Sequence, residues 1–287
     1  MTTVLVVDLG GTKTAIARVD ETGAVRDRRA VPAARSLDES IAQITAATQS
    51  VAAVGIVVPG IYSSESGRAW CPNLWGRDEV PLLDTLTRQL NVPVHIDSDR
   101  SGYVLGEAWL GAARGLRHVL FVSIGTGIGV GILADGEVLR GAGGVAGAAG
   151  WFALDPRWNE EYARTGCWEA ESAGPAVARN SGLPDAQAAV SAAKDGDRAA
   201  VAVLHHAARY SAMGIANLIS AFNPEAVVLG GGLMTGAGDL MLDVIRAEVP
   251  RWAQPIAASR CRIELTQLGE SAGLLGAARL ALKESVP

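Results

Sequence analysis

The feature that most constrains this chain is a strand–glycine turn–strand pattern that occurs twice. Residues 4–8 form a short apolar run, Gly10 and Gly11 interrupt it, and an alternating apolar pattern resumes over residues 12–20. Residues 118–138 repeat this order, with a glycine-rich turn at residues 125–129. Apolar runs broken by glycine are typical of strands joined by tight turns. Two copies in one chain predict a duplicated core.

The segments around these strand pairs alternate between strand and helix patterns, which predicts layered α/β units. We expect helices over residues 36–51, 82–90, 101–110, 197–222 and 271–283, and buried strands over residues 53–58, 92–96 and 226–229. Residues 62–76, rich in Ser, Gly, Pro and Asn, are expected to form a loop. The predicted small lobe comprises residues 1–115 and the C-terminal helix at about 271–287, and the large lobe comprises residues 116–270.

Composition and charge exclude several classes of protein. With 287 residues, of which 49% are hydrophobic and 19% charged, the chain is long enough for two globular domains. The net charge of −5 offers no basic excess for a phosphate backbone, so no nucleic-acid partner is expected. The three cysteines are far apart and suggest no disulfide framework. The N-terminus has no signal-peptide pattern, and glycines interrupt the longest apolar stretch, so we expect no membrane span and a cytoplasmic location.

Three glycine-rich turns follow apolar strands, at residues 8–13, 125–129 and 230–232. Glycine lets the backbone approach a ligand closely, and successive N–H groups with threonine hydroxyls can hold phosphate oxygens. One such turn alone is more often plain turn chemistry, but three at strand ends predict a nucleotide site. The predicted nucleotide-binding residues are Asp8, Gly10, Gly11, Thr12, Lys13, Gly125, Thr126, Gly127, Gly230, Gly231 and Gly232. The chain contains neither a P-loop nor a dinucleotide-binding glycine pattern.

Asp8 precedes the first glycine turn. A carboxylate beside a phosphate site is repulsive unless a cation lies between them, so we predict that Asp8 holds Mg²⁺, directly or through water. The alternative is that Asp8 only forms the turn at the strand end.

Several segments carry a resemblance to a known family. DLGGTKTA, SIGTGIGVGI and NPEAVVLGGGL resemble the phosphate and adenosine segments of the actin/hexokinase-type ATPase core. Nearly the whole chain resembles the ROK family of bacterial sugar kinases and sugar-responsive repressors, also at GIVVPG, PNL, DSDRSGYVLGE, GGVAG and GCWEAESAGPAVAR. The resemblance implies a two-lobed, ribonuclease H-like α/β fold with ATP and Mg²⁺ in the cleft between the lobes. It also implies phosphorylation of a sugar hydroxyl, and a homodimer.

The resemblance identifies Asp99 with the family's catalytic aspartate, which takes the proton from the acceptor hydroxyl. Asp99 follows a strand end, where site residues of α/β sheets commonly lie. From the residues alone, capping of the following helix by Asp97, Ser98 or Asp99 would be the simpler explanation. Asp97 is the fallback base. The resemblance also implies acceptor contacts from Pro59, Gly60, Asn73, Ser98 and Glu169, although Ser98 replaces the usual Asn and loses reach.

The largest departures from the family follow the turn at residues 143–147. The family's Glu-Ile-Gly-His is replaced by Ala148-Ala149-Gly150-Trp151, so a carboxylate and an imidazole that contact the sugar are lost. Of the family's cysteine-rich zinc loop only Cys167 remains, and one cysteine cannot form a tetrahedral zinc site, so we predict no zinc. Unpaired glucose hydroxyls would cost ~1–3 kcal/mol each. We therefore expect an altered acceptor, an amino sugar, deoxy sugar or cyclitol that offers a primary hydroxyl. Trp151 is a candidate to stack on its ring, with plain packing as the alternative.

The sequence leaves three alternative functions to consider. The first is a glucokinase-type hexose 6-kinase. The second is a catalytically inactive sugar sensor, suggested by the lost Glu, His and cysteines but opposed by the presence of Asp8 and Asp99. The third is a repressor, which in this family carries a DNA-binding segment ahead of the core. Because the first core strand begins at Val4, we expect no such segment here.

Overall fold

The computed structural model describes residues 2–283 and divides into two compact units. The first unit contains Met1–Gly115, Val138–Ala146 and Glu270–Pro287, and the second contains Leu116–Glu137 and Gly147–Gly269. Residues 138–146, which the sequence analysis assigned to the large lobe, therefore pack with the first unit. Residues 284–287 of the expected C-terminal helix lie outside the described residues.

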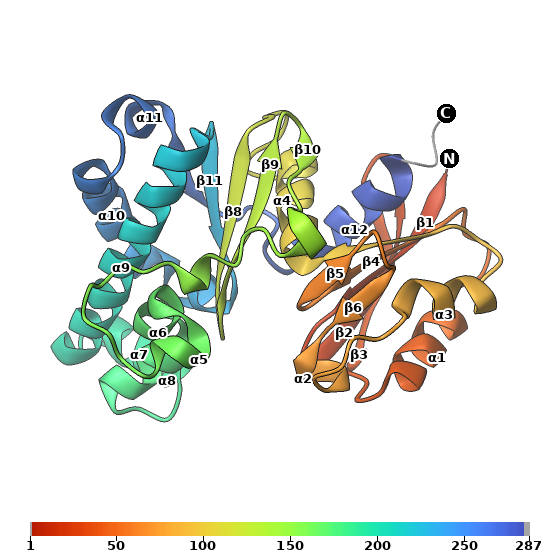
Figure 1. The fold of residues 1–287 in the computed structure, drawn as a ribbon, viewed down its shortest axis with the longest axis horizontal. Helices are drawn as coiled ribbons and strands as arrows, with labels where there is room; N and C mark the ends of the chain where they lie inside the picture. The colour runs from red at the N-terminus through yellow and green to blue at the C-terminus, as the bar shows by residue number, and fades with distance from the viewer. Residues whose placement is uncertain (1, 284–287) are drawn as a thin grey trace. The chain divides into compact units, whose positions relative to one another are not determined.

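The first unit is built on a five-stranded mixed sheet (Figure 1), in the order β3-β2-β1-β4-β7. These strands are β1 (Thr3–Leu9), β2 (Lys13–Asp20), β3 (Val25–Pro32), β4 (Val54–Val58) and β7 (Val94–Ser98). β1, β2 and β3 are antiparallel neighbours, whereas β4 is parallel to both β1 and β7. The carboxyl ends of β1, β4 and β7 therefore meet at one edge of the sheet, where ligand sites of α/β folds are commonly found.

Helices cover both faces of the first sheet. The first face packs against α1 (Leu37–Ala47) and α3 (Leu82–Gln89) through buried side chains such as Val7, Ile44 and Leu86. The other face carries α12 (Ala272–Lys283), which crosses α4 (Asp99–Leu110). A Cβ at Gly276 would overlap the Gly102 carbonyl, so glycine lets these two helices approach backbone to backbone. The expected helices at 36–51, 82–90, 101–110 and 271–283 are confirmed within a few residues.

The prediction of a loop over residues 62–76 is wrong in part. It contains the two-stranded pair β5 (Ile61–Ser63) and β6 (Arg68–Trp70), followed by the short helix α2 (Pro72–Trp75). Tyr62 and Ala69, which pair directly, are buried. Because each strand has only three residues, the alternation was too short to distinguish from a loop. The 3₁₀ turn η1 (Ala142–Gly144) packs against β5.

The second unit repeats the strand order of the first. Its sheet runs β10-β9-β8-β11-β12, with β8 (Val119–Ile124) antiparallel to β9 (Ile128–Ala134) and parallel to β11 (Ala226–Gly230). β12 (Arg262–Leu265) lies parallel to β11, and β10 (Glu137–Val138) is the opposite edge. The matching order and directions confirm the predicted duplication.

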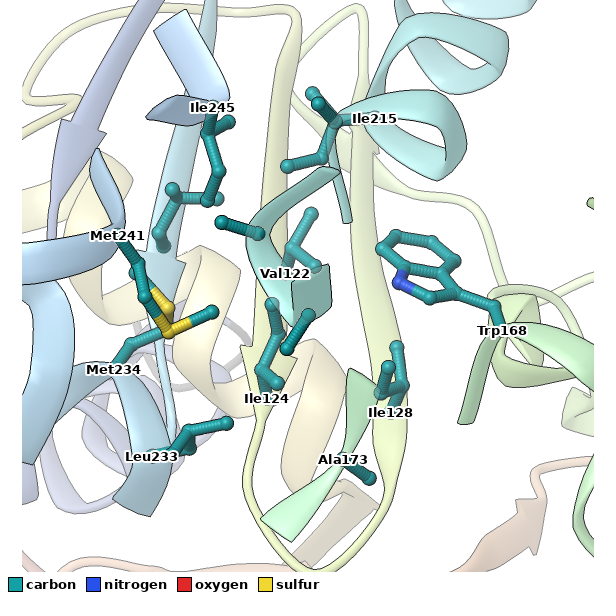
Figure 2. Close-up of a cluster of buried hydrophobic side chains, with 14 of the residues drawn as sticks. Val122, Ile124, Ile128, Trp168, Ala173, Ile215, Leu233, Met234, Met241 and Ile245 are labelled. Atoms are coloured by element: carbon teal, nitrogen blue, oxygen red, sulfur yellow. The ribbon is translucent and has the colours of Figure 1, made fainter. Parts of the chain in front are cut away.

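The core of the second unit joins this sheet to long helices (Figure 2). Val122 and Ile124 of β8 lie among Ile215 of α9 (Arg198–Phe222) and Met241 and Ile245 of α10 (Gly232–Trp252). α9 confirms the helix expected at 197–222. The remaining elements were not anticipated and are α5 (Tyr162–Thr165), α6 (Cys167–Ser172), α7 (Gly174–Ser181), α8 (Ala186–Lys194), α11 (Pro255–Arg260), η2 (Ala149–Trp151) and η3 (Gly269–Ser271). None of the helices in residues 2–283 has the length and apolarity needed to cross a bilayer.

Candidate active site

The first glycine turn has the geometry that a close ligand approach requires. Gly10 N–H donates to the Lys13 carbonyl at 3.0 Å, and a Cβ at Gly10 would lie 2.7 Å from that oxygen. Gly11 has no heavy atom within 4 Å of a Cβ position, so its backbone faces open space. The Thr12 carbonyl accepts from Ala33 N–H at 3.1 Å, which fixes the turn to the end of β3.

Asp8 lies near the end of β1 and Asp99 lies just after β7, with β4 between these two strands in the sheet. Burial and the nearby Asp99 carboxylate raise the pKa of Asp8 from 3.8 to about 7, although Lys13 and Arg28 oppose the shift. Burial also raises the pKa of Asp99 to about 6, against the opposing charge and N–H group of Arg100. Two acids that disfavour simultaneous ionisation form a site that a divalent cation would stabilise.

The structure shows which of residues 97–99 caps the following helix, α4. Ser98 is the N-cap of α4, and its buried hydroxyl accepts from Ser101 N–H at 3.3 Å and lies 3.0 Å from Ser101 Oγ. Asp99 instead begins the helix, and its carboxyl accepts from Arg100 N–H at 2.8 Å. The N-cap of α4 is therefore Ser98, and Asp99 occupies the first helical position.

Asp97, the fallback base, already forms an ion pair with Arg140. Its carboxylate is 2% exposed and accepts from Arg140 Nε and Nη2, each at 2.8 Å. It also accepts from Ser98 N–H at 2.7 Å. The Asp97 carboxylate is therefore occupied by the Arg140 guanidinium and the Ser98 N–H. This geometry favours Asp99.

The predicted acceptor residues of the first unit lie around the same sheet edge. Gly60 has φ +151°, a Cβ there would overlap the Trp70 carbonyl, and its own carbonyl accepts from Arg100 Nη2 at 3.3 Å. Pro59 directly follows β4 and is partly exposed. The Asn73 side chain is exposed on α2, and its carbonyl accepts from Arg35 at 3.4 Å.

The second unit holds the other two glycine turns. Gly125 N–H donates to the Gly127 carbonyl at 2.9 Å, and the Gly125 carbonyl accepts from Gly174 N–H at 2.7 Å. The third turn uses Gly231 at φ +88°, where a Cβ would lie 2.6 Å from the Ile124 carbonyl. Thr126, Gly230 and Gly232 flank these contacts at the carboxyl ends of β8 and β11.

Glu169 and Trp151 occupy the altered segment of this unit. Glu169 Oε2 accepts from Ile128 N–H at 2.7 Å, and burial raises the pKa of this carboxyl. A Cβ at Gly127 would lie 2.8 Å from the same oxygen, so the carboxylate stands directly beneath the second glycine turn. Trp151 ends η2 with 57% of its surface exposed, and Ala148 precedes that turn.

Sequence reasoning missed several charged residues around the site. Arg100 could have been noticed because it adjoins Asp99. Arg28, Arg140 and Glu270 carried no local signal, since the chain brings them in from distant positions. Glu270, for example, binds Lys13 Nζ at 2.8 Å.

Comparison with known proteins agrees with this architecture. The ROK family model matches residues 4–284. A glucokinase of Halalkalibacterium halodurans is 30% identical and covers 94% of this chain and 92% of its own, and an N-acetylmannosamine kinase of Escherichia fergusonii is 32% identical and covers 99% and 100%. The crystal structure of a ROK family glucokinase from Streptomyces griseus in complex with glucose and AMPPNP has a TM-score of 0.82 at 29% identity, covering 98% of this chain and 99% of that one. The expected fold class is thereby confirmed, and the chain belongs to the ROK family.

Proposed function

We propose that this protein is an ATP-dependent carbohydrate kinase that phosphorylates a primary hydroxyl of a hexose-like acceptor. The observation that carries the proposal is the pair of acids at the ends of β1 and β7, Asp8 and Asp99, whose pKa values are raised to about 7 and about 6. A general base works best when its pKa lies near the working pH. The kinases among the relatives described above support the same reaction class.

In the proposed reaction the acceptor oxygen attacks the terminal phosphorus of ATP, the bond to the ADP oxygen breaks, and the hydroxyl proton passes to the Asp99 carboxylate. Asp8 is the residue suited to holding Mg²⁺, because its half-buried carboxyl lies beside a second acid. When bound, Mg²⁺ supplies positive charge beside the phosphate oxygens. The glycine turns at 10–13, 125–127 and 230–232 offer backbone N–H groups for the nucleotide.

For the acceptor we propose an amino or otherwise modified sugar, or a cyclitol, in preference to plain glucose. Ala148 and Trp151 support this specificity, since neither can replace the hydrogen bonds of a carboxylate and an imidazole. An exposed indole suits the apolar face of a modified ring. The alternatives are a glucokinase-type hexose 6-kinase and an inactive sugar sensor.

The residues around Cys167 do not suit zinc. Cys167 Sγ accepts from Leu154 N–H at 3.4 Å, and Glu171, the nearby carboxylate, binds the Tyr162 hydroxyl at 2.6 Å and His206 at 3.3 Å. Within residues 2–283 no three His, Cys, Asp or Glu side chains are grouped to hold a metal ion. We propose that these hydrogen bonds hold α5 and the start of α6 in place without a metal.

Two further expectations belong to this proposal. ATP as donor and three free cysteines fit the reducing cytoplasm. A homodimer is supported by exposed apolar side chains of the second unit, Trp158, Trp252 and Ile256, with 74%, 54% and 59% of their surfaces exposed. Light scattering of the purified protein measures the oligomeric state directly.

The decisive experiment follows ADP release with Mg²⁺ and ATP against a panel of glucose, glucosamine, N-acetylated hexosamines, deoxyglucose and a seven-carbon cyclitol. We expect transfer to a modified acceptor, and loss of transfer in Asp99→Asn. The exposed carboxyl of Asp78 gives the matched control, Asp78→Asn. Strong preference for glucose would contradict the proposed acceptor class, and equal inertness of wild type and Asp99→Asn would favour the sensor.

A second variant tests the origin of the specificity. Ala148→Glu combined with Trp151→His restores the polar groups that the family carries at these positions. We expect this double variant to gain activity toward glucose relative to the wild type. Unchanged use of glucose would show that positions 148 and 151 do not set acceptor choice.

A further inference from the structure

The edge of the first sheet contains an irregularity beside the first glycine turn. Between β2 and β3, Ile16 pairs with Arg29 and Arg18 pairs with Arg26, so the single residue Ala17 faces both Asp27 and Arg28. Asp27 has φ +51°, a left-handed conformation that aspartate tolerates better than most residues. This is a β-bulge, a feature that commonly redirects a side chain next to a functional site.

The bulge changes the face on which Arg28 lies. Side chains alternate between faces along a strand, and directly paired residues of neighbouring strands share a face. Arg26 and Arg29 share the face of their partners Arg18 and Ile16. Arg28 directly precedes Arg29 and therefore lies on the face opposite to Ile16. Without the bulge, regular alternation from Arg26 would have placed Arg28 on the same face as Ile16.

That opposite face is the face of the phosphate turn. Lys13 and Ala15 lie on it, and Asp8 pairs directly with Ala15. Arg28 Nη1 donates to Ser271 Oγ at 3.0 Å, just before α12. The bulge thus adds a second cation to the face that carries Asp8 and Lys13.

One carboxylate, that of Glu270, forms ion pairs with both Lys13 and Arg28. Glu270 Oε1 lies 2.8 Å from Lys13 Nζ, and Glu270 Oε2 lies 3.7 Å from Arg28 Nη2. Glu270 is 67% exposed, so water weakens both ion pairs. A group of higher negative charge can therefore replace it at little cost.

We propose that Arg28 is a phosphate-binding residue, which receives the terminal phosphates of the nucleoside triphosphate together with Lys13 while Glu270 gives way. Guanidinium groups suit this role because their planar donors match phosphate oxygens in pairs. The inference rests on the proposed kinase function and identifies an additional residue for its donor site.

The test measures nucleotide binding without any acceptor, by titration calorimetry of the full chain with Mg²⁺ and AMPPNP, and separately with AMP. We expect Arg28→Ala to weaken AMPPNP binding by about tenfold or more, since hydrogen bonds to charged groups are the stronger kind, and to leave AMP binding within about twofold. Arg28→Lys should retain part of the affinity. Glu270→Gln should tighten AMPPNP binding, because the competing charge is gone.

The matched control is Arg29→Ala, which removes the same charge from the same strand on the opposite face. It should bind AMPPNP as the wild type does. The proposal is overturned if Arg28→Ala binds AMPPNP like the wild type, or if AMPPNP and AMP weaken equally. Should Arg28→Ala fail to fold by circular dichroism, Arg28→Gln gives the same comparison. A protein that is inert toward every acceptor but shows the AMPPNP-specific loss contradicts the kinase function and leaves the Arg28 assignment standing.

Discussion

The backbone of Gly273 lies directly against the carboxylate of Asp8. A Cβ at position 273 would overlap Asp8 Oδ2 and would also lie 3.1 Å from the ring of Tyr103. Gly273 is the second residue of α12, so the C-terminal helix returns to the end of β1 and sets the space available to its acid. The candidate site thus depends on Gly273, which is distant in sequence from the motifs that contain Asp8 and Asp99.

Gly273→Ala should therefore damage the site more than the fold. The added methyl must displace the Asp8 carboxyl, so we expect phosphoryl transfer to fall at least about tenfold, as misplacement of a catalytic group commonly does. Steady-state kinetics and thermal melting measure the two effects. The control is Gly236→Ala in α10, where the nearest atom, Val190 Cγ1, is 3.8 Å away. Equal activity of both variants would show that Asp8 tolerates the displacement.

The raised pKa of Asp8 predicts a pH-dependent cost to stability. Because its pKa is raised from 3.8 to about 7 in the folded state, protonated Asp8 stabilises the fold at low pH, and this stabilisation is lost as pH rises through about 7. Asp8→Asn should therefore be more stable than the wild type at pH 8.5, by on the order of 2–4 kcal/mol. The difference should shrink toward pH 4. Urea denaturation at several pH values, with Asp78→Asn as an exposed control, tests this, and a constant difference across pH would refute it.

The ion pair between Asp97 and Arg140 holds residues 138–146 to the first sheet. Asp97 is 2% exposed, so Arg140→Met leaves a buried carboxylate without its cation and should destabilise the protein by about 1–3 kcal/mol. The double variant Asp97→Asn with Arg140→Met should recover part of the loss, because the uncompensated charge is removed. Denaturant unfolding of the two single variants and the double variant gives the coupling. Simple additivity would mean that the pair does not act as a unit.

The sequence predicted those parts of the fold that are encoded locally. Glycine turns beside apolar runs predicted β1, β2, β8 and β9, and the shared strand order confirms the duplication they indicated. Longer helices such as α9 followed from apolar periodicity, but the glycine-rich start of α10 and its Pro250 obscured a helix of 21 residues. Glycine and proline lower intrinsic helix propensity, and packing against the sheet overrode that signal.

The site itself was predictable only where its residues lie at strand ends. Asp8 could be proposed in this way, and Asp99 only with the family resemblance, since its residues alone favoured a helix cap. Arg140 reaches Asp97 from 43 residues away. Arg28 was hidden for another reason. Its face depends on a one-residue bulge, and alternation read from the sequence places it on the wrong side of the sheet.

The segment around Cys167, at the start of α6, should carry no zinc. Its carboxylate Glu171 is occupied by Tyr162 and His206, which leaves too few ligands for a tetrahedral site. Purified protein should contain much less than one equivalent of zinc by mass spectrometry, and EDTA should leave its melting temperature unchanged. Stoichiometric zinc, with a lower melting temperature after chelation, would contradict this assignment.

The packing between α6 and α9 leaves no room for a side chain at position 214. Trp168 is fully buried, and a Cβ at Gly214 of α9 would lie 2.5 Å from its ring carbon Cε3. Although alanine raises helix propensity by about 1 kcal/mol over glycine, overpacking a core costs ~1–3 kcal/mol, so Gly214→Ala should be net destabilising. Gly236→Ala, with room for its methyl, should be neutral or stabilising. Because the cause is the indole ring, adding Trp168→Leu should reduce the cost of Gly214→Ala in denaturant unfolding. If the cost is the same in both backgrounds, the contact between α6 and α9 is not what requires glycine at position 214.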